Sequence, residues 1–470
     1  MDGRSIILVH PYLSGDTLFG GLESSARTGK ALSPGAFPVS SVKGVAVRKT
    51  DPFKSAGLVV GITVVLIAAA AAVTSDGSFS GGGLVGDGGN ASCPMIYSWD
   101  GHQWRLDSGT FGGAITRGAA RTDLDNLDYL APDGEQLRLR VANELNETDH
   151  LDGLAILAVD HPIAMGVAPD GAGRIHTIGA TVAPTEARDF AGRDVLARID
   201  SADGWAWESS LSGRDPERDY RDGVELSFPR STGDRDARLV LDAHNTPWAT
   251  YMLGTLIAAH GRETASWYDS LDANPGMLRQ LGGMLAREGF LSVAVLTRDG
   301  WEPQGFVWEA GPEVMKRQVH VLDLSRVEGD TVRVRLESAP AFWRLDRVAI
   351  DYSAEDSIVV RELAPKTARD ENGRDLRATL TAFDGDEYTI ETGGSAEVTF
   401  DSPPVPEGMA RSYILRSSGW YRIHTPEYGD PDRELLTAVL TQPRGGSKFA
   451  TERLNRALAA LTPSRDGAER

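Results

Sequence analysis

The chain has 470 residues, of which 41% are hydrophobic, and a formal net charge of −19 at pH 7. This hydrophobic content is enough for folded cores, which excludes an intrinsically disordered chain, and the length has room for about two to four domains. Residues 1–75 hold seven basic and four acidic residues, a charge of +3, so the remaining residues carry −22. Nucleic-acid binding needs a basic surface, and we therefore expect no nucleic-acid partner.

Short apolar segments with alternating character lie before residue 55, with Gly and Ser turns between them. They are SIILVHP (5–11), DTLFGGL (16–22) and SSVKGVAVRK (40–49). Alternation broken by turn residues is typical of β-strands. Residues 1–55 are therefore predicted to form a small SH3-like β-unit.

Ala56 to Val73 form an apolar run of 18 residues without a charged side chain. As a helix this run covers about 27 Å, just short of the roughly 30 Å hydrocarbon core of a membrane. Four basic residues precede it from Lys43 onward, whereas residues 75–89 contain none. The positive-inside rule then predicts a single-pass signal anchor in the cytoplasmic membrane, with a cytoplasmic N-terminus and a periplasmic or extracellular body. Cleavage by signal peptidase at the Ala-rich end is the alternative.

Cys93 is the only cysteine in the sequence. An intrachain disulfide therefore cannot form, and the exported cores must hold by packing. Residues 75–92, directly before it, are dominated by Gly and Ser. This composition predicts a flexible tether between the membrane and the body.

The exported part contains an internal repeat whose motifs recur in the same order and with similar spacing. The first copy has GEQLRLRV (134–141), LDGLAI (151–156), PTEARDFAGRD (184–194) and VELSF (224–228). The second copy has GDTVRVRL (329–336), LDRVAI (345–350), PKTARDENGRD (365–375) and AEVTF (396–400). This agreement predicts a tandem duplication.

In these motifs Leu and Val alternate with Arg, as in a strand with one buried face, and Asp-Gly pairs mark tight turns. Many short strands predict a β-sandwich, either jelly-roll or immunoglobulin-like. Helical spacing of apolar residues predicts helices after each copy, in 248–260, 277–288, 432–440 and 449–461. The predicted fold class is mainly β: tandemly duplicated β-sandwich modules with helical appendices and one N-terminal transmembrane helix.

The predicted domain order follows from these patterns. It is a cytoplasmic β-unit (1–55), a transmembrane helix (56–74), a Gly/Ser-rich tether (75–92), β-sandwich repeat 1 (93–248), a helical segment (249–290), β-sandwich repeat 2 (291–424), and C-terminal helices with a tail (425–470).

Alternate carboxylates in DLDNLD make Asp123, Asp125 and Asp128 a calcium candidate, because Ca²⁺ prefers oxygen ligands. The stretch departs from an EF-hand loop, since Leu127 takes a ligand position and Asp128 replaces the turn glycine, so a solvated turn is the alternative. The sequence has no HExxH or GxSxG motif. We therefore expect no metal and no cofactor, assign no catalytic residue, and favour a non-enzymatic protein.

Aromatic residues near predicted hairpins are the candidate ligand-binding residues. They are Trp99, Trp104 and Phe111 in the first copy and Trp301 and Trp308 in the second. Sugar rings stack on aromatic faces, which would suit a glycan ligand. Strand alternation also permits a core-facing row for such rings, so core packing remains the alternative.

Two segments carry a resemblance to known proteins: CPMIYSWDGHQWRLDSGTFGGAITRG (93–118) and RVANELNETDHLDGLAILAVDHP (140–162). They resemble a set of bacterial membrane-anchored envelope proteins with a CPxxYxWDG hairpin and a GGA segment, for which no activity is established. The resemblance implies a common fold and export. It transfers no catalytic residue.

The sequence therefore predicts a membrane-anchored bacterial envelope protein whose duplicated β modules act in binding or assembly. Its partner would be a glycan, a peptide or an envelope protein, and residues 56–74 would hold it in the membrane. One alternative is a carbohydrate-active hydrolase with β-sandwich domains. Another is an assembly protein in which the apolar stripe of residues 449–461 faces another subunit.

Overall fold

The computed structural model describes residues 8–14, 17–22, 33–38, 93–209, 215–218, 220–230, 235–308 and 310–461. The chain divides into two compact units, Met1–Ala69 and Ala70–Arg470.

The first unit contains a three-stranded antiparallel sheet of β1 (Leu8–Ser14), β2 (Thr17–Leu22) and β3 (Ser33–Pro38), in that order. The first two strands overlap the segments predicted at 5–11 and 16–22. The strand predicted at 40–49, the apolar run 56–73 and the tether 75–92 lie outside the described residues. Among the described helices, none is both long and apolar enough to cross a membrane.

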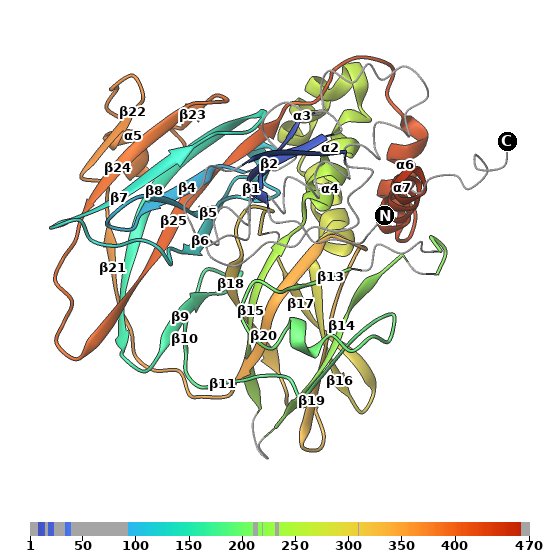
Figure 1. Cartoon of the computed structure of the whole chain (residues 1–470), viewed down its shortest axis with the longest axis horizontal. Coiled ribbons are helices and arrows are strands. Elements are labelled where there is room, and N and C mark those ends of the chain that lie inside the picture. Colours follow the sequence, from blue (N-terminus) through green and yellow to red (C-terminus); the bar gives the residue numbers. More distant parts are fainter. Residues whose placement is uncertain are drawn as a thin grey trace. The chain divides into compact units, whose positions relative to one another are not determined.

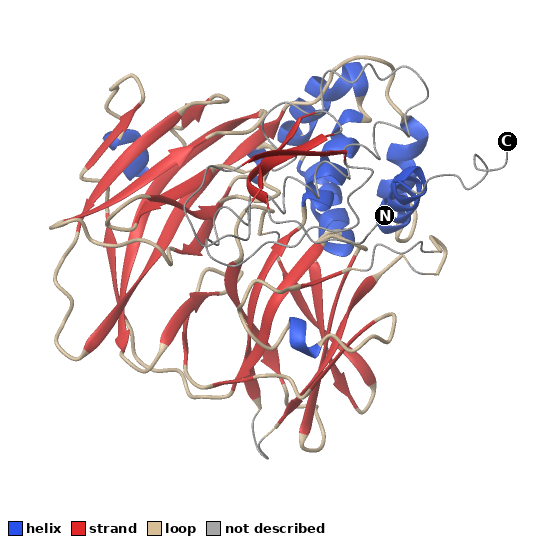
Figure 2. Cartoon of the chain, in the orientation of Figure 1, coloured by secondary structure: helices blue, strands red, loops and turns tan. Residues whose placement is uncertain are grey.

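The second unit is mainly β, and its large sheets form two pairs (Figure 1, Figure 2). We call two sheets that share one hydrophobic core a sheet pair. In the first sheet pair, one sheet has the strand order β22 (Thr367–Asp370), β24 (Ser395–Asp401), β7 (Gln136–Ala142), β4 (Met95–Trp99) and β5 (Trp104–Gly109). The other sheet has the strand order β21 (Val359–Leu363), β8 (Glu147–Pro162), β25 (Met409–Ile423) and β6 (Arg121–Asn126). A further strand, β23 (Tyr388–Ile390), also pairs with β8.

The second sheet pair has the same layout. One sheet has the strand order β12 (Glu186–Asp189), β14 (Asp222–Pro229), β19 (Thr331–Ser338), β16 (Leu291–Thr297) and β17 (Gly300–Val307). The other sheet has the strand order β11 (Thr181–Val182), β20 (Trp343–Asp351), β15 (Asp236–Asn245) and β18 (Lys316–Asp323). A further strand, β13 (Trp207–Glu208), also pairs with β20. A separate hairpin of β9 (Gly166–Pro169) and β10 (Ile175–Ile178) lies between β8 and β11 in the chain.

The cores form because alternate residues of each strand point inward. Along β7 the Leu and Val side chains are buried while the Arg side chains between them are half-exposed, as the alternation predicts. Ile96, Leu139 and Phe400 belong to the core of the first sheet pair. Leu241 and Val334 belong to the separate core of the second.

The repeat motifs occupy matching places in the two sheet pairs, but the pairing crosses between the predicted copies. Strand β7, from the first copy, pairs with β24, from the second. Strand β19, from the second copy, pairs with β14, from the first. The predicted ranges 93–248 and 291–424 are therefore not separate sheet pairs, since each pair combines strands from both. Alternation determines which face of a strand is buried, but it does not choose between two similar partner strands.

The main helices are α2 (Pro247–Ala258), α3 (Thr264–Ala273), α4 (Pro275–Glu288), α6 (Arg433–Thr441) and α7 (Gly445–Leu461), and α5 (Arg377–Ala382) is shorter. The side chains of Thr246, Asn274 and Asp432 accept backbone hydrogen bonds at the starts of α2, α4 and α6. Helices α2, α4, α6 and α7 confirm the four segments predicted from helical spacing, whereas α3 and α5 were not predicted. In α7, Leu454 is buried and Phe449 packs against the core of the first sheet pair, so this part of the predicted stripe packs within its own chain.

Candidate functional site

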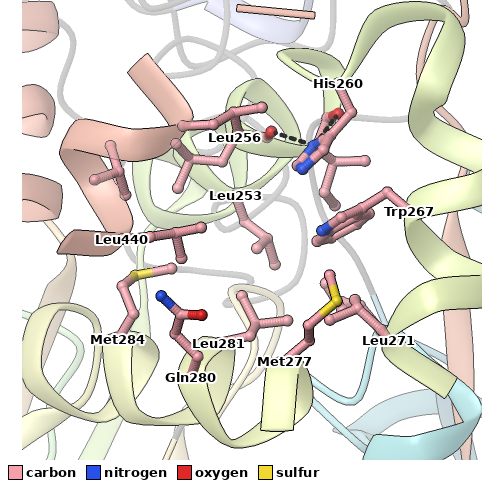
Figure 3. Close-up of a pocket in the computed structure, with 14 residues that line it drawn as sticks. Leu253, Leu256, His260, Trp267, Leu271, Met277, Gln280, Leu281, Met284 and Leu440 are labelled. Carbon is pink, nitrogen blue, oxygen red and sulfur yellow. Dashed lines mark hydrogen bonds between the residues drawn. The ribbon is translucent and has the colours of Figure 1, made fainter. Parts of the chain in front are cut away.

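A partly open, apolar pocket lies among helices α2, α3, α4 and α6 (Figure 3). It encloses about 60 Å³. The residues that line it are Ile115, Leu253, Leu256, Ile257, His260, Trp267, Leu271, Met277, Gln280, Leu281, Met284, Leu436, Val439 and Leu440. We call this the helical pocket.

The sequences of α2 and α4 explain why these helices leave a pocket. Helix α2 is apolar along nearly its whole length, with Trp248 and Met252 among its buried residues and Leu256 at the pocket. Helix α4 is amphipathic, since Leu281 is buried and Gln280 is exposed. A helix that is apolar on all sides must pack against neighbours on several faces. The pocket is where neighbouring side chains leave α2 incompletely packed.

The polar groups at the pocket are few. His260 stacks on Trp267 with 4.1 Å between ring centroids, and its Nδ1 lies 3.1 Å from the carbonyl oxygens of Leu256 and Ile257. Both partners are acceptors, so Nδ1 carries the proton and donates. Burial lowers the pKa of His260 and favours the neutral ring. At neutral pH the pocket therefore presents an uncharged and mostly apolar lining, to which Gln280 adds a neutral amide.

Two methionines give the pocket some capacity to adapt. Met277 and Met284 lie on α4, one on each side of Leu281 in the sequence, and line the pocket with it (Figure 3). Unbranched thioether side chains change rotamer at low cost and fit irregular apolar surfaces. Such a pocket can bury an apolar group of a ligand, which contributes about 0.8 kcal/mol per CH₂.

The aromatic residues predicted to bind a ligand do not come together in one place. Trp99 and Trp104 are adjacent, with 5.4 Å between ring centroids, but the guanidinium of Arg138 lies over both rings at 4.8 and 5.2 Å. In the other sheet pair, Arg335 lies 4.1 Å from the ring of Trp301. A stacked guanidinium occupies a face that a sugar ring would need.

The two remaining aromatic candidates differ in exposure. Phe111 is completely buried in the core of the first sheet pair, so the structure supports its core role. Trp308 is 47% exposed, and its ring centroid lies 5.1 Å from that of Phe290.

Two of the three calcium candidates are neutralised by basic side chains. Asp123 is paired with Arg121 at 2.7 Å, and Asp125 Oδ1 lies 2.5 Å from Lys316 Nζ. Asp128, the third candidate, is exposed. Across the described residues, no group of three or more His, Cys, Asp or Glu side chains could hold a metal ion. The Lys316 contact instead joins β18 of the second sheet pair to β6 of the first.

Sequence patterns do not predict the helical pocket, because they predict most of its residues only as parts of helical appendices to the β modules. The available signal was the apolar character of residues 248–260 on all sides, together with the methionines of α4. A helix that is apolar all round needs several packing partners. The sequence does not show which of its faces stays partly open.

Comparisons with known proteins leave the chain without an assigned family. No protein-family model matches it, and no curated protein matches it. Among solved structures it is similar to the GH31 alpha-xylosidase from Xanthomonas citri, with 9% identity and a TM-score of 0.16, over 68% of this chain and 25% of the xylosidase. The chain thus spans about a quarter of the xylosidase. A likeness at this TM-score carries no inference about fold or function.

Proposed function

We propose that this chain is a membrane-anchored envelope protein that binds a partner protein. An apolar side chain of the partner enters the helical pocket. The observation that carries this proposal is the pocket itself: a partly open hollow with an almost entirely apolar lining. Small apolar hollows of this kind bind by burying side chains as anchors.

The size of the pocket favours a single side chain over a larger ligand. A cavity of about 150 Å³ is known to hold one benzene ring. The helical pocket encloses about 60 Å³, so it suits an aliphatic side chain such as Leu rather than a lipid or a fused ring system.

The chemistry of the lining favours a protein over a glycan. Sugar hydroxyls placed against Leu, Ile and Met side chains would lose their hydrogen bonds to water without replacement, which costs about 1–3 kcal/mol for each group. The predicted sugar-stacking faces of Trp99, Trp104 and Trp301 are already in contact with arginines. None of the described contacts favours the alternative carbohydrate-active hydrolase.

The proposed architecture is a pair of duplicated β-sandwich modules held at the membrane by residues 56–74. The matching strand orders of the two sheet pairs support the duplication. The charge-free apolar run supports the anchor. Export and anchoring stay predictions, because residues 39–92 lie outside the described ranges.

A labelled peptide tests the pocket. The probe is a fluorescein-labelled amphipathic helical peptide with Leu at positions i, i+3 and i+7, compared with a peptide in which Gln replaces these residues. We expect fluorescence anisotropy to show binding of the Leu peptide to the full chain. Leu436→Gln, at the pocket wall, should weaken this binding at least about tenfold, because burying a Leu side chain contributes about 1.5–3 kcal/mol.

Leu435→Gln is the matched control, because Leu435 is also half-buried on α6 but does not line the pocket. Circular dichroism would check that both variants fold. Equal loss of binding in both variants, or equal binding of the Leu and Gln peptides, would refute the proposal.

A further inference from the structure

Two matching ion pairs show how the sheet pairs are assembled. Strands β8 and β20 contain matching sequences, LAVD (157–160) and VAID (348–351). The carboxylate of Asp160 accepts hydrogen bonds from Arg411 at 2.6 and 2.9 Å, and that of Asp351 accepts one from Arg238 at 2.9 Å. Both aspartates are fully buried. In each pair, one residue comes from the first sequence copy and the other from the second.

The outer faces of the sheets repeat this crossing. Arg333 donates to Glu225 at 3.0 Å in the second sheet pair. The matching residues in the first sheet pair are Arg138 and Glu397, whose side chains lie 3.8 Å apart. Each arginine therefore contacts the glutamate that the other sequence copy supplies.

Two connecting segments cross from one sheet pair to the other. Residues 163–180 lead from β8 to β11, and residues 352–358 lead from β20 to β21. The start of β11 pairs with the end of β20, and the start of β21 pairs with the end of β8. Each connection thus leaves one sheet pair and enters the other at the point where its counterpart leaves.

We propose that the strands of this chain can assemble into sheet pairs in two ways, which use the same kinds of strand contact. We call these two arrangements the exchanged closure and the unexchanged closure. The exchanged closure is the one described above. In the unexchanged closure, residues 93–248 and 291–424 would each form their own sheet pair, and the contacts between the two connections hold the chain in the exchanged form.

These contacts form a compact group that we call the crossing cluster: His176, Glu355, Arg238 and Asp351. His176 Nδ1 lies 2.6 Å from Glu355 Oε1, and Arg238 donates to the same oxygen at 3.4 Å. The backbone N–H of Gly179 donates to Asp351 at 2.9 Å. Nearby, the backbone N–H of Asp356 donates to the hydroxyl of Thr177 at 3.0 Å.

The crossing cluster separates the two closures energetically. In the unexchanged form the ion pairs would re-form with changed partners, Arg238 with Asp160 and Arg411 with Asp351, so they favour neither closure. The contact between His176 and Glu355 joins the two connections and would be lost. A charge-assisted contact of this kind therefore biases the choice.

Disulfide reporters in the full chain distinguish the closures. In a Cys93→Ala background, Ala158→Cys with Tyr413→Cys reports the exchanged closure, because these residues are register partners on β8 and β25. Ala158→Cys with Val240→Cys reports the unexchanged closure, because Val240 faces Ala349, which matches Ala158. Directly opposite strand residues are close enough for a disulfide.

The chain is unfolded in denaturant, refolded and oxidised, and the cross-links are identified by mass spectrometry. We expect the otherwise unchanged chain to form the 158–413 cross-link. With His176→Ala and Glu355→Ala added, the 158–240 cross-link should rise about tenfold, the factor expected for loss of a charge-assisted hydrogen bond. Glu355→Ala alone is a milder variant, since the Glu355 side chain is 50% exposed.

Arg174→Ala is the matched control, because it removes an ion pair with Asp170, which also lies 2.9 Å from His176, and so disturbs one connection without removing a side chain that contacts the other. The proposal is overturned if the refolded cluster variants give only the intramolecular 158–413 cross-link. A 158–413 cross-link between two chains would also overturn the proposal. It would show that strands of one chain pair with strands of a second copy instead of forming the unexchanged closure. Formation of 158–240 in the unvaried chain would refute the exchanged closure itself.

Discussion

Two histidines whose pKa values are lowered in the folded chain should make its stability depend on pH. His244 is at most 9% exposed, and burial together with Arg344 lowers its pKa to about 4. His150, stacked on Trp420 at 3.8 Å between ring centroids, also has its pKa lowered to about 4, by burial first and then by Arg422. Both rings are therefore neutral in the folded chain at neutral pH. Protonating either ring would place a charge where water reaches it poorly, which is unfavourable.

We predict that His244 makes the fold less stable in acid. In the unfolded chain its pKa returns to about 6.5, so between pH 6.5 and 4 the unfolded chain binds this proton more strongly and stability falls as pH falls. The loss from this group is about 2 kcal/mol at pH 5. His244→Gln should therefore show a smaller drop in Tm between pH 7 and pH 5 than the unvaried chain.

His102→Gln, at an exposed position, is the control for this experiment and should leave the drop unchanged. Burial raises the pKa of Asp107 to about 7, which gives a contribution of opposite sign. That contribution cancels when the variant is compared with the unvaried chain. An equal pH dependence in His244→Gln would contradict the prediction.

At the scale of elements, close approach of neighbouring strands requires glycine at particular positions. The pairing of β25 with β8 shifts register between Ser418 and Gly419. A Cβ at Gly419 would overlap the carbonyl oxygen of His150 and lie 2.9 Å from the Phe111 ring. The glycine therefore allows the bulged strand to lie directly on the ring of Phe111.

We predict that Gly419→Ala destabilises the first sheet pair by about 1–3 kcal/mol, the usual cost of overpacking a filled core. Thermal unfolding followed by near-UV circular dichroism would measure it. Gly166→Ala in β9 is the control, because a Cβ there meets nothing within 4 Å. Equal Tm values for the two variants would show that the strand can shift to make room.

At the scale of the whole molecule, each sheet pair needs both halves of the chain. A cut between the two sequence copies would leave two fragments that each contribute strands to both sheet pairs. Such interleaved fragments cannot separate without breaking both cores. The second unit should therefore behave as one stable body even when its backbone is interrupted.

This property is tested with a protease site inserted between Ala273 and Asn274, an exposed position between α3 and α4. After cleavage we expect size-exclusion chromatography to show one species of unchanged size, and denaturing electrophoresis to show two fragments. Dissociation in native buffer would contradict the exchanged arrangement.

Much of the fold and little of the candidate site follow from local sequence patterns. The alternation in LRLRV predicted a strand with one buried face, and β7 has that burial pattern. Helical spacing predicted α2, α4, α6 and α7. The aromatic candidates fared differently, since Phe111 lies in a core and the rings of Trp104 and Trp301 lie against arginines. A strand period shows that a ring points to one side, but not what packs there.

The sequence by itself determined many of the strands, their burial faces and helices α2, α4, α6 and α7, because each depends on residues close together in the chain. Comparison of distant segments also revealed the recurring motifs. The tertiary structure alone decided which copy each strand pairs with and where the helical pocket lies. The two copies present nearly the same partner surfaces, so local patterns favour both pairings equally. Contacts such as that between His176 and Glu355, which lie far apart in the chain, distinguish them.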